Sequence, residues 1–169
     1  MKAVVFSLLF GSLLSTASLR AQCPETHEQF AERQALLYAD SLVKAFYSHN
    51  ISQYISLSYP GAVLFYGGKS GFERFLETVM YSAQNVDSLP RTGLHQLVKE
   101  EDGVWQCVVE KISNELVDGK KATIRNFMVG RSHDNGKTWS FFEPALTTYQ
   151  VHDVMPDAYV NVPARRIEY

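Results

Sequence analysis

The chain has 169 residues, 46% of them hydrophobic, and a formal net charge of -2. This length suits one domain with a substantial core. The slight negative charge, together with the lack of a basic run interleaved with aromatic residues, excludes a general nucleic-acid binder.

Residues 1–21 have the three-part layout of a secretory signal. Lys2 supplies the charged start, residues 3–14 are almost wholly apolar, and small and polar residues continue to Ala21. We therefore expect cleavage near Ala21, a periplasmic or secreted protein, and a mature chain of residues 22–169 that forms one domain. The apolar stretch is shorter than the roughly 20 residues of a spanning helix, so no stable membrane span is expected.

The chemical state of the two cysteines, Cys23 and Cys107, has several possible interpretations. In an oxidising compartment they could form one disulfide between the N-terminus and a central strand. Alternatively, Cys107 is a buried free thiol that packs like a small hydrophobe. Cys23 also allows lipidation as in a bacterial lipoprotein, although Arg20 and Gln22 stand where that signal prefers small or aliphatic residues. Two distant cysteines without clustered histidines predict no metal site.

The mature chain begins with apolar residues at helical spacing, which predict one long amphipathic helix over residues 26–48. Thr26 is the expected N-cap, with Gln29 as its capping-box partner. A short helix is predicted over residues 51–56, started by Asn50.

A break at Tyr59-Pro60-Gly61 then interrupts the helical pattern. Residues 62–66 form an apolar run rich in strand formers, which predicts a short strand ended by Gly67-Gly68. The next helix is expected to begin at Ser70 and to end near residue 84, because apolar residues recur at helical spacing.

The segment from residue 94 to Pro144 is predicted to form an antiparallel meander. The predicted strands cover residues 94–100, 104–117, 121–131 and 138–142. The turn between the second and third strands, Asp118-Gly119, carries the strongest short hairpin signal. Helices first and an antiparallel sheet afterwards predict an α+β fold with the helices on one face of the sheet.

Apolar residues on both sides of the strand over 104–117 predict that both sheet faces are covered. One face carries Val104, Val108 and Ile112, and the other carries Trp105, Cys107 and Val109. Helices are expected on one face, and the C-terminal tail or the second subunit of a homodimer on the other. The tail is expected to contain a short helix near residues 147–154 and then an extended end.

The order of predicted elements over residues 26–143 resembles that of nuclear-transport-factor-like (cystatin-like) domains. More narrowly, residues 132–141 and the tail motifs Val154-Met155-Pro156-Asp157 and Val162-Pro163 look like uncharacterised small secreted proteins of gut-type bacteria with that fold. The resemblance implies a curved antiparallel sheet that the helices wrap into a cone with an internal pocket. This superfamily includes isomerases, dehydratases, cyclases and non-enzymatic modules, so the fold does not choose among functions.

An acid–base site in such a pocket needs an inward-facing carboxylate or histidine. Asp40 on the long helix and His95 on a strand are the candidates. The side chains that could donate hydrogen bonds to a ligand are Tyr38, Tyr54, Tyr66 and Arg125. Each candidate also has a structural alternative: Asp40 lies off the apolar stripe of its helix, and His95 sits between leucines like a structural histidine.

The pattern Ser132-x-Asp134-x-Gly136-x-Thr138-Trp139 fits the Asp-box hairpin known from sialidases and other propellers. In that hairpin the aspartate accepts hydrogen bonds from nearby backbone donors, and the glycine supplies a positive φ. A single copy cannot build a propeller, so the pattern predicts a structural turn.

The sequence contains no strong catalytic motif, and its aromatic content of 12% could line an apolar pocket or fill a core. We therefore expect a non-catalytic exported module without cofactor or metal, which binds a small apolar ligand or a protein partner. One alternative is an isomerase, dehydratase or cyclase that uses Asp40 and His95 as acid and base. Another is a homodimeric structural subunit.

Overall fold

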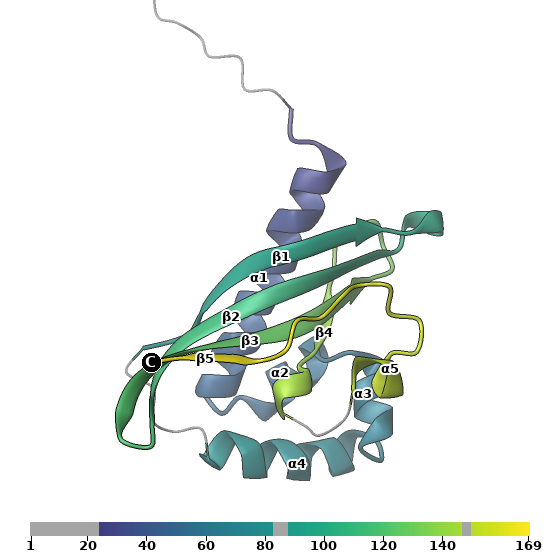
Figure 1. The fold of residues 1–169 in the computed structure, drawn as a ribbon. Coiled ribbons are helices and arrows are strands. Elements are labelled where there is room, and N and C mark those ends of the chain that lie inside the picture. The colour runs from purple at the N-terminus through teal and green to yellow at the C-terminus, as the bar shows by residue number, and fades with distance from the viewer. Residues whose placement is uncertain (1–23, 83–87, 147–149) are drawn as a thin grey trace, which may run out of the picture.

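The computed structural model describes residues 24–82, 88–146 and 150–169 (Figure 1). Helices come first within these residues, and they are α1 (His27–Tyr47), α2 (Ile51–Leu57), α3 (Pro60–Phe65) and α4 (Lys69–Ser82). The strands of one open antiparallel sheet follow: β1 (Arg91–Lys99), β2 (Trp105–Val117), β3 (Lys120–Ser132), β4 (Ser140–Phe142) and β5 (Arg166–Glu168). The predicted α+β class is confirmed.

The two N-terminal helices begin at the caps that the sequence predicts. The Thr26 hydroxyl accepts a hydrogen bond from the Gln29 N–H at 3.1 Å, and the Gln29 side chain accepts one from the Thr26 N–H at 3.0 Å. The Asn50 side chain accepts a hydrogen bond from the Gln53 N–H at 3.1 Å at the start of α2. Both caps satisfy donors that the first helical turn leaves unpaired.

The prediction of a strand over residues 62–66 was wrong, because this run forms α3. Pro60 occupies the first turn of the helix, where its fixed φ is favourable and its missing N–H costs nothing. The backbone that pairs with the sheet lies just before it: the Tyr59 N–H donates to the Phe141 carbonyl at 2.7 Å. Gly67 and Gly68, both with φ of 83°, follow the helix.

The sheet is ordered β1-β2-β3-β4, with β5 also paired to β3. β2 and β3 are 13 residues each and pair along their whole length. On the other edge of β3, β4 lies opposite residues 129–131 and β5 opposite residues 123–125. Asp118 and Gly119 join β2 to β3 with φ of 51° and 74°, the positive values that a two-residue hairpin turn requires.

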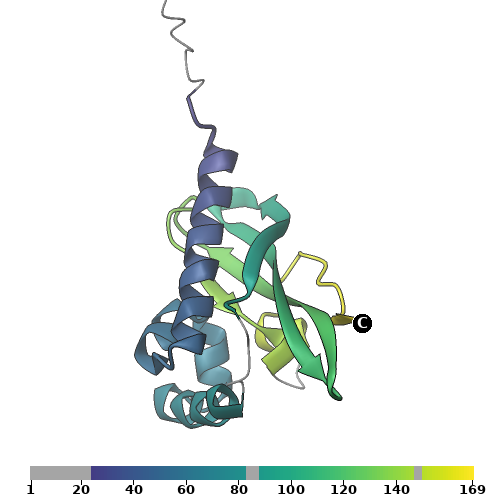
Figure 2. The same ribbon diagram turned by 90° about the vertical axis from the view of Figure 1, so that its left-hand side faces the viewer.

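Both faces of the sheet are covered, as the sequence predicts, and both by this chain (Figure 2). On one face, Trp105, Cys107 and Val109 pack with α1, α2 and α4. On the other face, Val108 and its neighbours pack against the tail. The buried residues of this second cluster are Val108, Phe127, Val129, Val151, Met155, Ala158 and Val160.

The tail contains the short helix α5 (Val151–Val154) and then runs extended to β5. The helix was predicted near residues 147–154, of which 147–149 lie outside the described residues. The predicted signal and Cys23 also lie outside them. Within the described ranges, no helix combines the length and the apolar character needed to cross a bilayer.

Candidate functional site

The structure does not bring Asp40 and His95 together. Asp40 lies on α1, half-buried, where its carboxylate accepts a hydrogen bond from the Thr92 hydroxyl at 2.6 Å. His95 lies at an irregularity in the pairing of β1, is exposed, and contacts Phe127 with 5.4 Å between ring centroids. Since Phe127 belongs to the tail-covered face, the two candidates sit on opposite sides of the sheet and share no pocket.

Arg125 and Tyr38 do not lie in a common site, and each makes contacts that support the fold. The Arg125 guanidinium donates to Glu110 and to Glu168, each at 3.1 Å, and these carboxylates raise its pKa. Glu168 belongs to β5, so Arg125 ties that strand to the sheet. Tyr38 is half-buried on α1 and packs at the margin of the helix-side core.

Tyr54 and Tyr66 do come together, around a cavity between the helices and the sheet. Tyr54 is buried, and Tyr66 stacks on Phe75 with 4.3 Å between ring centroids. Glu143 lines the same cavity, whose volume is about 10 Å³. That space suits about one water molecule. This cavity between the helices and the sheet is therefore too small for an organic ligand.

Next to this cavity lies a buried ion pair that the sequence reading missed. Lys111 of β2 contacts Glu143, and their side chains are only 6% and 4% exposed. The Lys111 ammonium also lies 5.7 Å from the centroid of the Phe46 ring. Burial and the nearby Glu143 carboxylate together raise the pKa of Tyr54. Strand alternation was the available signal, because Lys111 shares its parity with the core residues Cys107 and Val109.

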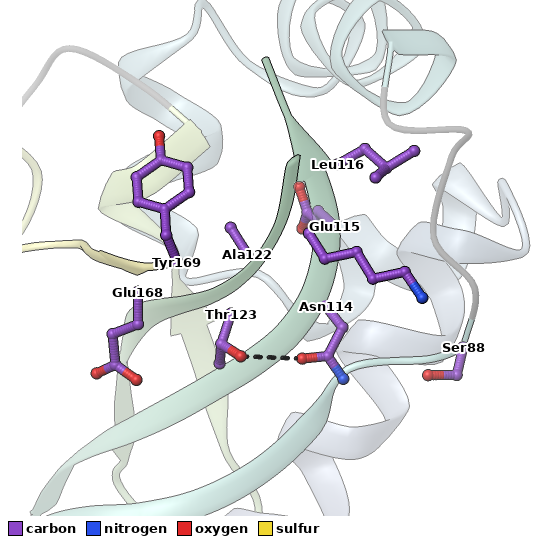
Figure 3. A pocket seen from close by; sticks show the side chains of 9 residues that line it. Ser88, Asn114, Glu115, Leu116, Ala122, Thr123, Glu168 and Tyr169 are labelled. Atoms are coloured by element: carbon purple, nitrogen blue, oxygen red, sulfur yellow. Dashed lines mark hydrogen bonds between the residues drawn. The ribbon is translucent and has the colours of Figure 1, made fainter. Parts of the chain in front are cut away.

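A groove of about 510 Å³ lies at the end of the β2–β3 hairpin, beside β5 (Figure 3). We call it the hairpin groove. Its walls come from four separate parts of the chain. The lining residues are Ser88, Asn114, Glu115, Leu116, Lys121, Ala122, Thr123, Glu168 and Tyr169. The volume lies within the range of small-molecule sites.

The lining of the hairpin groove is amphipathic. Leu116 and Tyr169 leave 70% and 74% of their surface exposed. Asn114 accepts a hydrogen bond from the Thr123 hydroxyl at 3.1 Å, so these two polar groups are held in place by each other. Lys121 is exposed, and it forms no ion pair with another described residue. The groove thus combines apolar surface with an available positive charge.

The Asp-box pattern forms the structural turn that was predicted. The Asp134 carboxylate accepts hydrogen bonds from the N–H of Thr138 at 2.9 Å and of Lys137 at 3.1 Å. Burial raises the pKa of Asp134, but the hydrogen bonds from Thr138, Ser132 and Lys137 outweigh it, and the net pKa is lowered. Gly136 has φ of 77°. These hydrogen bonds pair the Asp134 carboxylate with the backbone of its own turn.

Comparisons with known proteins add no relative to this picture. The sequence matches no protein-family model, and it is similar to no curated protein and to no solved structure in the comparisons.

Proposed function

We propose that this protein is an exported, non-catalytic binding module that takes a small amphipathic molecule in the hairpin groove. The observation that carries the proposal is the contrast between two spaces. The groove offers about 510 Å³. The interior cavity behind the helices offers about 10 Å³. Export is part of the proposal and is supported by the layout of residues 1–21.

The chemistry of the groove supports an amphipathic ligand. An apolar body would cover Leu116 and Tyr169, whose exposed surface favours burial. A polar or anionic head would lie toward Lys121 and Thr123. Two carboxylates also line the groove, Glu115 of β2 and Glu168 of β5, and Glu168 is paired with Arg125 at 3.1 Å.

A nuclear-transport-factor-like cone also remains a proposal. The order of a long helix, short helices and an antiparallel meander supports it. α3 stands where the resemblance expects a strand, and the small interior cavity favours a surface groove over an internal pocket as the ligand site.

The two alternative functions have less structural support. An acid–base enzyme would need Asp40 and His95 around one ligand, and they lie on opposite sides of the sheet. A homodimer was suggested by apolar residues on both faces of β2, and this chain's own helices and tail cover both faces.

The test uses two fluorescent probes that differ by one sulfonate, N-phenyl-1-naphthylamine and 8-anilino-1-naphthalenesulfonate. Each is titrated into the mature chain and into two matched variants, Leu116→Ser and Leu64→Ser. Leu116 lies in the groove, and Leu64 lies on α3; they are 70% and 74% exposed. Near-ultraviolet circular dichroism checks that each variant keeps its tertiary packing.

We expect saturable binding with one site per chain. Leu116→Ser should weaken it about fivefold, because part of a leucine side chain no longer covers the probe. Leu64→Ser should leave it unchanged. Tighter binding of the sulfonated probe would support a contact with a cationic side chain, as Lys121 offers. Equal loss in both variants, or the absence of saturable binding, would contradict the proposal.

A further inference from the structure

The hairpin groove depends on the C-terminal tail for one of its walls. Glu168 and Tyr169, which close the groove on one side, lie at the end of β5 and directly after it. β5 pairs with only three residues of β3, and all three of its own residues are exposed. Short exposed elements of this kind open easily on their own. Beyond this pairing and the ion pair of Glu168 with Arg125, the wall therefore depends on another attachment that keeps the tail on the sheet.

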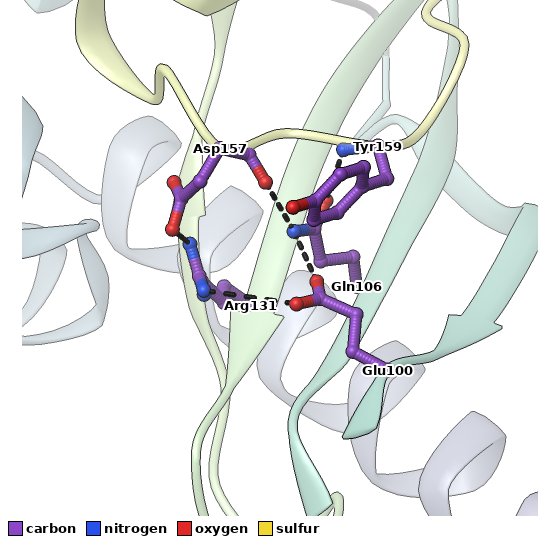
Figure 4. A network of polar contacts seen from close by, with 5 residues as sticks. All are labelled: Glu100, Gln106, Arg131, Asp157 and Tyr159. Atoms are coloured by element: carbon purple, nitrogen blue, oxygen red, sulfur yellow. Dashed lines mark hydrogen bonds and ion pairs between the residues drawn. The ribbon is translucent and has the colours of Figure 1, made fainter. Parts of the chain in front are cut away.

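That attachment is a polar network about ten residues earlier in the tail (Figure 4). Gln106 of β2 is fully buried. Its side-chain amide donates to the Asp157 carbonyl at 2.8 Å, and its side-chain oxygen accepts from the Tyr159 N–H at 2.9 Å. One side chain thus pairs with the tail backbone on both sides of Ala158, as a neighbouring strand would.

A charged contact reinforces this polar network, which we call the anchor. Arg131 of β3 binds the Asp157 carboxylate, and its guanidinium also lies 3.9 Å from Glu100. The side chain of Arg131 is 9% exposed, whereas that of Asp157 is 48% exposed. The buried guanidinium of Arg131 is therefore fixed in the sheet, whereas the Asp157 carboxylate that it binds belongs to the more exposed tail.

A second attachment lies between the anchor and β5. The Asn161 N–H donates to the Gln96 side chain of β1 at 3.1 Å. Beyond it, the chain has no further described hydrogen bond to the sheet until β5 begins at Arg166. Because the anchor keeps the tail close to the sheet, the effective concentration of β5 near β3 is high. The anchor therefore favours the state in which β5 is paired and the wall of the groove is closed.

Resting on the proposed function, we propose that the tail is a strap whose docking and ligand binding in the hairpin groove favour each other. A ligand that contacts Tyr169 binds only when the tail is docked, so its apparent affinity falls with the docked fraction. Linkage requires the reverse as well: a bound ligand must hold the tail on the sheet.

The experiment uses Asp157→Asn, which weakens the anchor from outside the groove, and Glu77→Gln as a control. Glu77 is exposed on α4, on the other side of the sheet, and its substitution also removes one negative charge. Gln96→Ala is a second variant, which removes the attachment of Asn161. N-phenyl-1-naphthylamine is titrated into each protein, and hydrogen exchange of residues 166–168 is followed with and without the probe.

Asp157→Asn and Gln96→Ala are each expected to weaken probe binding about threefold or more, while Glu77→Gln leaves it unchanged. The probe should slow hydrogen exchange in β5 of the unaltered chain. If the unaltered chain binds the probe but all variants bind it equally, or if exchange in β5 ignores the probe, the strap is overturned and the binding function stands. If the unaltered chain does not bind the probe, both are overturned.

Discussion

Lys111 and Glu143 are the charged residues that the described part of the fold buries on the helix side of the sheet. A buried ion pair adds little stability compared with apolar residues, because both charges lose their hydration. Breaking such a pair is costly, since the remaining charge has no partner. The pair therefore joins the segment after β4 to β2 while adding little to the stability of the fold.

Replacing Lys111 by Met is predicted to lower the free energy of unfolding by about 3–5 kcal/mol, because Glu143 is left buried without a counter-charge. The double variant Lys111→Met/Glu143→Leu should recover most of that loss. Urea unfolding followed by circular dichroism measures both. A single variant as stable as the double variant would show that Glu143 finds water or another partner.

The β2–β3 hairpin shows how one element is specified by its turn. Asp118 and Gly119 both have positive φ, and a Cβ at Gly119 would meet no atom within 4 Å. The requirement for glycine there is therefore conformational and not steric. Because the hairpin groove is built on the residues next to this turn, the turn also sets the shape of the candidate site.

Gly119→Ala is predicted to lower the free energy of unfolding by about 1 kcal/mol, through backbone strain alone. Gly93 in β1 provides the control, because a Cβ there also meets nothing within 4 Å and its φ is not positive. Gly93→Ala should be neutral or slightly stabilising in denaturant unfolding. Equal losses at the two positions would mean that the turn relaxes without cost.

At the scale of the whole molecule, one sheet separates a helix layer from the tail. Cys107 lies on the helix side with no exposed surface. Burial raises the pKa of its thiol, and a backbone hydrogen bond at Gly130 opposes that shift without cancelling it. A thiol in this state reacts only when the layers separate. Its pairing with Cys23 remains a prediction, because Cys23 lies outside the described residues.

Cys107 is therefore a reporter of global opening. In the variant Cys23→Ser, we expect no reaction of the native protein with a disulfide reagent such as dithionitrobenzoate, and one reacting thiol in guanidinium. In the exported, unaltered chain, the lack of any reacting thiol in guanidinium would show that the two cysteines are paired. Rapid reaction of the native variant would contradict the tight packing between the sheet and the helices.

Local sequence features determined the elements that depend on neighbours along the chain. The helix caps at Thr26 and Asn50 and the turn at Asp118 and Gly119 follow from short-range hydrogen bonding and allowed backbone angles. Local features did not predict the structure of residues 62–66, because a five-residue apolar run suits a strand or a helix equally. There Pro60 and the pairing of Tyr59 with Phe141 decided the outcome.

Tertiary structure alone decided which side chains meet. Lys111 and Glu143 are 32 positions apart in the chain, and the hairpin groove collects residues from four segments. Asp40 and His95 were plausible by residue type, yet opposite sides of the sheet separate them. Sequence periodicity specifies the face on which a residue lies, whereas strand pairing and packing across layers specify its neighbours, and only the folded chain contains that information.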